Sequence, residues 1–392
     1  MQSATNTIIF NSAPNPVPDA IPLADLRRVL VIKLRHHGDV LLTSPVFSVL
    51  KLHAPHLEID ALIYADTAAM LELHPAIAQI HTIDRAWKKR GVFAQAAAEM
   101  GLYKQLKARQ YDLVIHLTEH PRGAWLTRLL GPRYAVAQKI AGKPKFWRNS
   151  FTHLYGQPSN ALRHTVECNL DALCRIGIQI GIQPASNERS LVLVSGKAAD
   201  ARVDALLVQH DLTKKKFIHF HPASRWFFKC WTVEKNAELL RQLHAAGHRV
   251  VMTCAPDQRE QNFVSAILAQ AAIQNDGNPI VDLSGQLSLK ELAALASRAA
   301  LFVGVDSAPM HIAAAMQTPV VVLFGPSGDH EWGPWSPVGV PNRVITSTAH
   351  PCRPCGLDGC GGGKVSECLT TLPVNRVLAA CEELLAMSTA AA

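Results

Sequence analysis

Short apolar segments of strand length alternate with longer helical patterns along the 392 residues of the chain. The expected strands lie at 29–34, 57–64, 112–117, 217–221, 249–254, 279–283, 301–305 and 319–324. Helices are expected between them, at 45–53, 91–109, 122–130, 232–246, 257–272, 288–299 and 309–317. Apolar strands that alternate with helices are typical of parallel sheets covered on both faces. The chain is therefore expected to have an α/β fold.

This alternation occurs in two blocks, and one domain usually takes about 100–200 residues, so two domains are expected. The weakly periodic segment between the blocks gives a linker over 183–198, with a first domain over 23–182 and a second over 199–388. Residues 1–22 are expected to be a flexible lead-in. The fold that follows is two Rossmann-like, doubly wound domains that face each other across a central cleft.

The charge balance favours an anionic partner. Lys and Arg number 39 against 31 Asp and Glu, a formal net charge of +8. Nucleic acid, a phosphorylated substrate and a membrane surface all fit this excess, as does a plain solubilising surface. No zinc-finger spacing, helix-turn-helix or RNP signature is visible, so nucleic acid is not expected.

Targeting and membrane-spanning signals are not apparent. Residues 1–22 hold four prolines and no Lys or Arg, so no basic region precedes an apolar one. The nearly uncharged run 301–328 contains Asp306 and breaks into pieces of strand length. A buried β-α-β unit fits that run better than a membrane span does. The chain is expected to be cytoplasmic.

The first strand-to-helix turn, KLRHHGDVLLTSP at 33–45, is a candidate catalytic segment. Ligands of doubly wound folds bind beyond the carboxyl ends of the strands. Gly38 permits a tight turn there, and Asp39 follows it among basic residues that include Arg35. One carboxylate in such surroundings can act as a general base. The alternative is that Asp39 only caps the turn or pairs with Arg35.

A second candidate is VGVDSAPMHIAAA at 303–315, where a strand ends at Asp306 and a helix follows. The backbone N–H groups expected to face the cleft belong to Ser307, Ala308 and Met310. A helix N-terminus favours an anion such as a diphosphate, and His311 could add a donor. The alternative is ordinary packing with Asp306 as a helix cap.

A third candidate is HFHPASRWFFKCW at 219–231. Arg225 and Lys229 are placed to reach a phosphate from the opposite wall of the same site. Aromatic residues interleave with them, a pattern that also occurs in nucleic-acid stacking. Without a nucleic-acid module, phosphate contact is the favoured interpretation.

Four of the nine cysteines cluster in the glycine-rich loop 351–368. They are Cys352, Cys355, Cys360 and Cys368. Such thiols could hold a structural Zn²⁺ or an iron–sulfur cluster, or remain free. The spacing matches neither standard metal pattern. Four thiolates would leave no open position, so a metal here would be structural and not catalytic.

Taken together, KLRHHGDVLLTSP at 33–45, DLVIHLTEHPRGAWLTRLLG at 112–131 and VGVDSAPMHIAAAMQTPVVVLFGPSG at 303–328 resemble the lipopolysaccharide heptosyltransferases, glycosyltransferase family 9. The continuation FGPSGDHEWGPWSP at 324–337 is most similar to the heptosyltransferase III branch. The resemblance extends over about residues 28–375.

The resemblance implies a GT-B fold in which the first domain binds the acceptor and the second binds ADP-heptose. It implies inverting transfer of a heptose from ADP-L-glycero-β-D-manno-heptose to an inner-core heptose of lipopolysaccharide, with no cofactor or catalytic metal. The protein would be cytoplasmic and peripheral at the inner membrane. Two other classes remain open: another GT-B nucleotide-sugar enzyme such as an epimerase, and a non-catalytic, metal-stapled binding protein.

The family's motifs also assign roles to residues of this chain. The catalytic base corresponds to Asp39, and the donor-phosphate lysine to Lys229. The other donor-binding positions correspond to Ser224, Leu287, Ser288, Asp306, Ser307, Ala308 and His311. Ser288 with Glu291 also fits a helix capping box. For the anionic acceptor, the candidates are Arg122, Arg163, His164 and the run Lys88-Lys89-Arg90.

Overall fold

The structure is a computed structural model that describes residues 17–156, 162–180, 187–273 and 279–390. Its first half forms a six-stranded parallel sheet in the order β3-β2-β1-β4-β5-β6. The strands are β1 (Arg28–Ile32), β2 (Glu58–Tyr64), β3 (Gln79–Ile83), β4 (Leu113–His116), β5 (Tyr134–Gln138) and β6 (His153–Tyr155). The helices are α1 (His37–Leu41), α2 (Ser44–His53), α3 (Val92–Ala108), α4 (Pro121–Leu130), α5 (Lys145–Arg148) and α6 (Thr165–Arg175).

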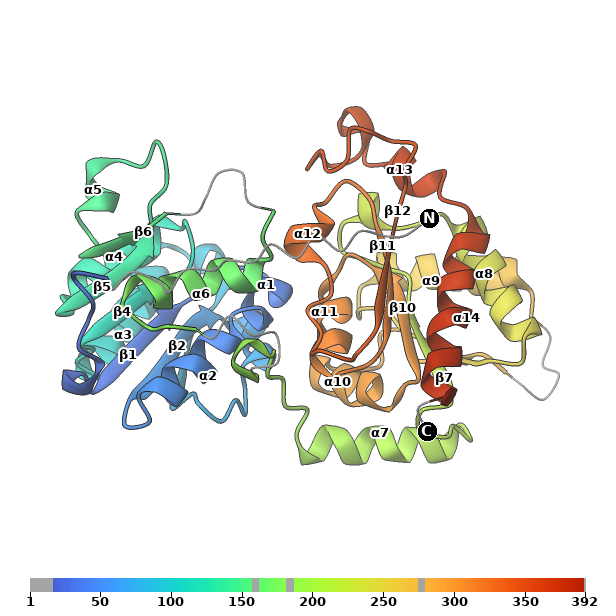
Figure 1. The fold of residues 1–392 in the computed structure, drawn as a ribbon, viewed down its shortest axis with the longest axis horizontal. Helices are drawn as coiled ribbons and strands as arrows, with labels where there is room; N and C mark the ends of the chain where they lie inside the picture. Colours follow the sequence, from blue (N-terminus) through green and yellow to red (C-terminus); the bar gives the residue numbers. More distant parts are fainter. Residues whose placement is uncertain (1–16, 157–161, 181–186, 274–278, 391–392) are drawn as a thin grey trace.

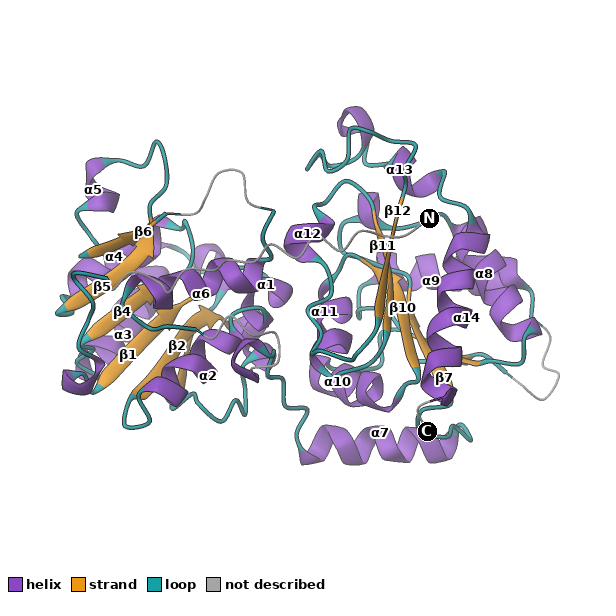
Figure 2. Cartoon of the chain, viewed as in Figure 1, coloured by secondary structure: helices purple, strands orange, loops and turns teal. Residues whose placement is uncertain are grey.

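The second half repeats this topology in the order β12-β11-β10-β7-β8-β9. Figure 2 shows the strands of each half in orange, with helices around them. Its strands are β7 (Phe217–His221), β8 (Arg249–Met252), β9 (Val281–Asp282), β10 (Leu301–Val305), β11 (Val320–Phe324) and β12 (Asn342–Thr346). Its helices are α7 (Lys197–Gln209), α8 (Val233–Ala245), α9 (Gln258–Ala271), α10 (Leu289–Arg298), α11 (Ala308–Ala315), α12 (Asp329–Trp332), α13 (Glu367–Thr370) and α14 (Val374–Ala390). Both sheets thus have the doubly wound order, in which successive strands are first added on one side of the first strand and then on its other side.

Alternation of side chains along the strands builds two apolar layers on each sheet. On the first sheet, Val29 and Val31 pack with α2 and α6, whereas Leu30 and Ile32 pack with α3 and α4. The second sheet packs α8, α9 and α14 on one face and α7, α10 and α11 on the other. Figure 1 shows the two domains side by side, with α1 of the first turned toward α11 of the second. The expected α/β, GT-B-like fold is confirmed.

All eight expected strands form, but β3, β5, β6 and β12 were not expected. Each of these carries polar residues and lies toward a sheet edge, so the apolar pattern that marked the central strands is weak there. The run 301–328 forms β10, α11 and β11, as the sequence predicted. No helix within the described ranges is long and apolar enough to cross a bilayer.

The end of the predicted lead-in is packed against the first domain. Ile21 is buried in its core, and Asp19 forms an ion pair with Arg175 at 2.6 Å. Residues 1–16 lie outside the described part of the chain, as do residues 183–186 of the expected linker. The last residues of the predicted lead-in thus contact the first domain in this structure.

Six buried histidines predict a protein that loses stability in mild acid. Burial lowers their pKa values to about 3 or 4; they are His74, His116, His164, His219, His221 and His311. The unfolded chain binds protons at these positions below about pH 6.5, whereas the folded chain does not until about pH 4. The free energy of unfolding should therefore fall as the pH drops, by up to ~1.4 kcal/mol per pH unit for each histidine.

Urea unfolding at about pH 7 and about pH 5 measures this loss. His219 and His221 share the hydroxyl of Thr253, at 2.8 Å each, and no carboxylate pairs with either ring among the described residues. The double variant His219→Gln/His221→Gln should lose less stability between these two pH values than the unmodified protein. Equal free energies of unfolding at both pH values would contradict the prediction.

Candidate active site

Asp39 lies in α1, the short helix that follows β1 at the carboxyl edge of the first sheet. Its side chain is 13% exposed, and its Oδ1 accepts a hydrogen bond from Arg35 Nε at 3.3 Å. Arg35 is more than half exposed, so water screens this pair strongly. The contact orients the carboxylate but contributes little to stability. Asp39 therefore pairs with Arg35 and still lies at the edge where a ligand would bind.

Gly38 brings α1 against α11 of the second domain. A Cβ atom at this position would lie 2.8 Å from Cδ2 of His311 and 3.3 Å from its Nε2. Only glycine permits so close an approach without a shift of the imidazole. Asp39 and the start of α11 are thus held near each other by direct packing of two domains.

Gly38→Ala should therefore destabilise the protein by about 1–3 kcal/mol, because the added methyl group must displace a buried ring. Alanine in place of glycine inside a helix ordinarily stabilises by about 0.5–1 kcal/mol, so the expected sign is reversed. Gly101→Ala in α3 is the matched control, since a Cβ there meets nothing within 4 Å. Urea unfolding of both variants gives the comparison. If Gly38→Ala is as stable as Gly101→Ala, the tight contact does not exist.

His311 fills the space between the acidic groups of the two domains. It is 4% exposed, and its Nδ1 is buried with no hydrogen-bond partner among the described residues. Burial lowers the pKa of His311 to about 4, although Asp306 and Asp39 act in the opposite direction. The ring is neutral at neutral pH. A buried polar atom without a partner indicates a missing partner, such as a group of a bound ligand.

Lys229 and Asp306 form the second ion pair of the site. Lys229 Nζ lies 2.6 Å from Asp306 Oδ2, with the two side chains 18% and 7% exposed. The ammonium also lies 5.2 Å from the ring centre of Trp226, and that ring meets His36 of the first domain edge-on. Lys229 thus reaches from its loop to the end of β10, next to the start of α11.

The start of α11 offers fewer free donors than the sequence predicted. The N–H groups of Ser307 and Ala308 have no acceptor within the described ranges, but Met310 N–H donates to Ser307 O at 3.1 Å. Pro309 has no N–H. The Ser307 hydroxyl donates to Val305 O at 3.2 Å. Two backbone donors, not three, therefore remain for an anion, because the first turn closes on itself.

Three other predicted donor residues already have roles in the fold. The Ser224 hydroxyl accepts the N–H of Trp226 at 3.4 Å. Leu287 packs against the cores of both domains. Ser288 begins α10 with the predicted capping box, its hydroxyl accepting Glu291 N–H at 3.3 Å and its own N–H donating to Glu291 Oε2 at 2.7 Å. Ser288 can therefore still donate its hydroxyl proton to a ligand.

The predicted acceptor residues lie in different surroundings. Arg122 forms an ion pair with Glu99, and Arg163 donates to both oxygens of Asp171 at 2.8 and 2.9 Å. His164 is buried; it accepts the N–H of Val166, donates to Gly333 O at 3.0 Å and stacks on Trp335 at 4.6 Å. Both ring nitrogens of His164 are occupied, so this residue joins the two domains.

Sequence reasoning named Arg122 and Lys88 but missed that they belong to one cluster of cations, with Lys143 and Arg85, around the turn between β4 and α4. The pKa of His120 in that turn is lowered by partial burial and then by nearby positive charges. Those charges are Arg122, Lys88, Lys143 and Arg85. They follow the ends of β3, β4 and β5, and two of these strands were not expected. Recognition of β3 and β5 would have placed the four cations at one edge of the sheet.

Lys33 is a second residue that sequence reasoning left without a role. It is buried at the end of β1, and its Nζ donates to Asn169 Oδ1 at 2.9 Å. Asn169 Nδ2 in turn donates to Leu42 O at 3.0 Å, at the end of α1. Burial lowers the pKa of Lys33 to about 8, against the attraction of Asp39. This chain of hydrogen bonds fixes the helix that carries Asp39.

The cysteine loop does not form a metal centre in the described part of the chain. No group of three or more His, Cys, Asp or Glu side chains there could hold a metal ion. Cys352, Cys355 and Cys360 are exposed free thiols, and Cys368 is buried. Of the possibilities left open for this loop, a structural zinc therefore has no support.

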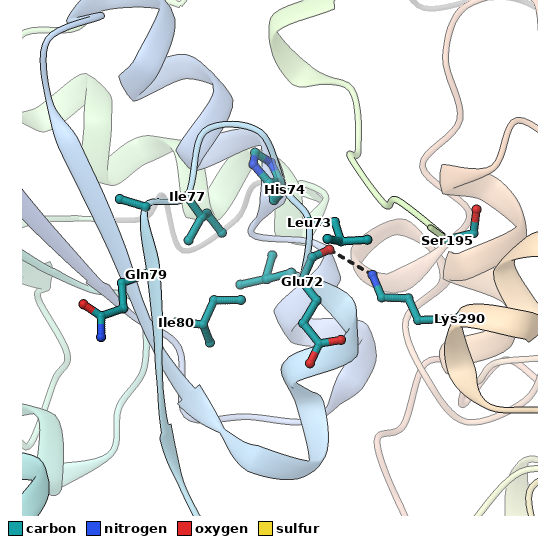
Figure 3. A pocket seen from close by; sticks show the side chains of 10 residues that line it. Glu72, Leu73, His74, Ile77, Gln79, Ile80, Ser195 and Lys290 are labelled. Atoms are coloured by element: carbon teal, nitrogen blue, oxygen red, sulfur yellow. Dashed lines mark hydrogen bonds between the residues drawn. The ribbon is translucent and has the colours of Figure 1, made fainter. Parts of the chain in front are cut away.

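A pocket of about 470 Å³ lies between the two domains, away from the contact of α1 with α11 (Figure 3). Its wall includes Glu72 and Leu73 of the first domain, Ser195 of the connection and Lys290 of α10. Lys290 Nζ donates to Glu72 O at 2.9 Å and to Val194 O at 2.5 Å. None of the predicted site residues lines this pocket. Lys290 therefore holds the domains together and is separate from the candidate site.

Comparison with known proteins places the chain among enzymes. The family model described as glycosyltransferase family 9 (heptosyltransferase) matches residues 100–360. Lipopolysaccharide heptosyltransferase 3 of Escherichia coli is 35% identical over 357 residues, which cover 91% of this chain and 98% of that protein.

Two solved structures show the same fold. A glycosyl transferase family 9 protein from Veillonella parvula has a TM-score of 0.77 at 22% identity, with 94% of this chain and 99% of that one covered. The heptosyltransferase WaaC of E. coli with ADP-2-deoxy-2-fluoro heptose has a TM-score of 0.66 at 20% identity, with 91% and 99% covered. The whole chain, and not one domain alone, is similar to these proteins.

Proposed function

The chain belongs to glycosyltransferase family 9, and we propose that it transfers a heptose from ADP-L-glycero-β-D-manno-heptose to an inner-core heptose of lipopolysaccharide. Membership of a glycosyltransferase family excludes the two alternatives considered above, an epimerase and a non-catalytic binding protein. The observation that carries the proposal is the juxtaposition of Asp39, His311 and the Lys229–Asp306 pair between the two domains. The relative named heptosyltransferase 3 supports the choice of acceptor.

The second domain would bind the donor diphosphate. The free N–H groups of Ser307 and Ala308 lie at the positive end of α11, which stabilises an anion. The Lys229 ammonium would move from Asp306 to a phosphate oxygen, or contact both at once. As the bond between the anomeric carbon and the diphosphate breaks, its electron pair leaves with ADP. Lys229 and α11 would stabilise the charge that develops there.

Asp39 would accept the proton of the acceptor hydroxyl as that oxygen attacks the anomeric carbon. The attack comes from the face opposite the departing ADP, so the configuration is inverted. Arg35 and the chain Lys33–Asn169–Leu42 would keep the carboxylate in position. The unpaired Nδ1 of His311, between Asp39 and Asp306, would bond to the donor.

The first domain would bind an anionic acceptor. The cations around His120 lie at the same edge of the sheet as Asp39, because the carboxyl ends of parallel strands meet at one edge. Core sugars that carry phosphate or carboxylate groups fit this charge. Since such an acceptor is attached to a lipid, the enzyme would work as a peripheral protein on the cytoplasmic face of the inner membrane.

The test is to incubate the protein with ADP-heptose and lipopolysaccharides truncated at defined core sugars, and then to weigh the products. We expect a mass increase of one heptose only on acceptors that already carry inner-core heptose. Release of free heptose without acceptor modification, or transfer to acceptors that lack inner-core heptose, would contradict the proposed acceptor.

Chelation gives a separate test of the donor site. We expect EDTA to leave the transfer rate unchanged, because Lys229 and α11 meet the donor phosphates and no pair of carboxylates of the DxD type accompanies them in the sequence. Rates measured before and after brief treatment decide the point. Immediate loss of activity that Mg²⁺ or Mn²⁺ alone restores would show that a metal takes part.

A further inference from the structure

The N-terminal part of α3 is an exposed apolar surface that the proposed reaction does not use. Val92 is 81% exposed and Phe93 is 92% exposed. From residue 91 to residue 98 the sequence, GVFAQAAA, contains no charge. The first buried side chain of the helix is Leu102, ten residues after its start. We call residues 92–98 the α3 tip.

The α3 tip projects beyond the sheet that α3 covers. Glu99 forms an ion pair with Arg122 in the first turn of α4, which begins at the carboxyl edge of the sheet. At a rise of about 1.5 Å per residue, Val92 lies about 10 Å beyond Glu99 along the helix axis. In keeping with this position, residues 92–98 are all exposed or partly exposed.

The fold by itself gives no reason for apolar residues in the α3 tip. The helix is anchored by Leu102 and Leu106, which pack in the first domain. Polar side chains at the exposed positions of the tip would leave this packing unchanged. Exposed apolar clusters that contribute nothing to a core mark surfaces that contact a partner or a membrane.

The charges beside the α3 tip indicate what kind of partner contacts it. Lys88, Lys89 and Arg90 directly precede it, and all three are exposed. Arg90 pairs with Asp84, but neither Lys88 nor Lys89 has an acidic partner among the described residues. Apolar side chains next to free lysines match a bilayer that contains anionic lipids, where the side chains insert and the lysines meet the headgroups.

We propose that the α3 tip, together with Lys88 and Lys89, docks the protein on an anionic lipid bilayer. The tip follows β3, and Asp39 follows β1, so both lie at the carboxyl edge of the first sheet. Docking through the tip would therefore bring the membrane to the edge where the acceptor binds. Only this benefit of docking, access to a membrane-bound acceptor, rests on the proposed function. Binding of the α3 tip to lipid requires neither donor nor acceptor.

Sedimentation of the full chain with vesicles tests the proposal. One set contains phosphatidylethanolamine and phosphatidylglycerol, and the other contains phosphatidylcholine alone. We expect binding to the anionic set that weakens as salt increases. Val92→Ser/Phe93→Ser and Lys88→Glu/Lys89→Glu should each lower the partition coefficient about tenfold or more.

Matched controls lie on the second domain. Val208→Ser removes an equally exposed apolar side chain, and Arg202→Glu/Lys216→Glu reverses two exposed positive charges. Both should bind vesicles as the unmodified protein does. Transfer to a lipid-free core oligosaccharide should be unaffected by Val92→Ser/Phe93→Ser, and this separates failure of docking from failure of the proposed function.

Two results would overturn the proposal. The first is binding to anionic vesicles that both tip variants retain in full. The second is no vesicle binding together with a dimer, measured by light scattering, that Val92→Ser/Phe93→Ser converts to a monomer. In that case the α3 tip joins two copies of the chain.

Discussion

Replacing Asp39 with asparagine is expected to lower turnover about 10²–10⁴-fold, while ADP-heptose still binds. The amide keeps the size of the carboxylate and its contact with Arg35, but it cannot accept the proton of the acceptor hydroxyl. In the proposed mechanism the donor is bound by Lys229 and α11, on the other domain, so its affinity should change little. Initial rates and calorimetric titration with ADP-heptose measure the two quantities separately.

Asp66→Asn is the matched control for this variant. Asp66 is also an acidic residue after a strand of the first sheet, and it pairs with Arg85 at 3.2 Å. Removal of its charge should change the rate by only a few-fold. Turnover of Asp39→Asn within a few-fold of the unmodified enzyme would show that another group is the base.

Lys229→Ala is expected to lower kcat/KM for the donor about 10–100-fold, with a much smaller effect on the KM of the acceptor. A charge-assisted hydrogen bond is worth about 1.5–3 kcal/mol, and the charge on the leaving diphosphate is greatest in the transition state. Loss of the ammonium also leaves Asp306 without its partner at 2.6 Å, so a negative charge then faces the diphosphate. Steady-state kinetics in both substrates measure the effect.

Two further variants separate these contributions. Lys229→Ala/Asp306→Asn should bind the donor more tightly than Lys229→Ala alone, because the unpaired carboxylate is gone. Lys229→Arg should rescue only in part, since the guanidinium differs in shape and reach. Lys216→Ala, at an exposed lysine on the same domain, serves as the control. If kcat and the donor KM of Lys229→Ala are both unchanged, Lys229 lies outside the site.

The central strands and the helix starts followed from local sequence. Strands such as 217–221 and 301–305 form with the predicted bounds, because a strand covered on both faces must be apolar throughout. The Ser288–Glu291 capping box was also predicted, since both partners lie within one turn. The edge strands β3 and β12 escaped prediction because polar residues are tolerated where one side of a sheet meets solvent.

The candidate site was predictable only in its parts. The position of Asp39 after β1 and that of Lys229 before α8 followed from motifs and from the rule that ligands bind at strand ends. The pairing of Lys229 with Asp306, 77 residues apart, did not follow. His164 was expected to contact the acceptor, but the structure places it against Gly333 and Trp335 of the other domain.

The sequence by itself thus determined two doubly wound domains, the elements of each and the residue types available at their strand ends. These features depend on periodicity and on contacts between residues a few positions apart. Only the tertiary structure decided which groups meet: Gly38 packs against His311, Lys229 pairs with Asp306, and four cations surround His120. The physical reason is that the free energy of a buried charge or imidazole depends on what surrounds it in three dimensions, and those surroundings come from segments far apart in the chain.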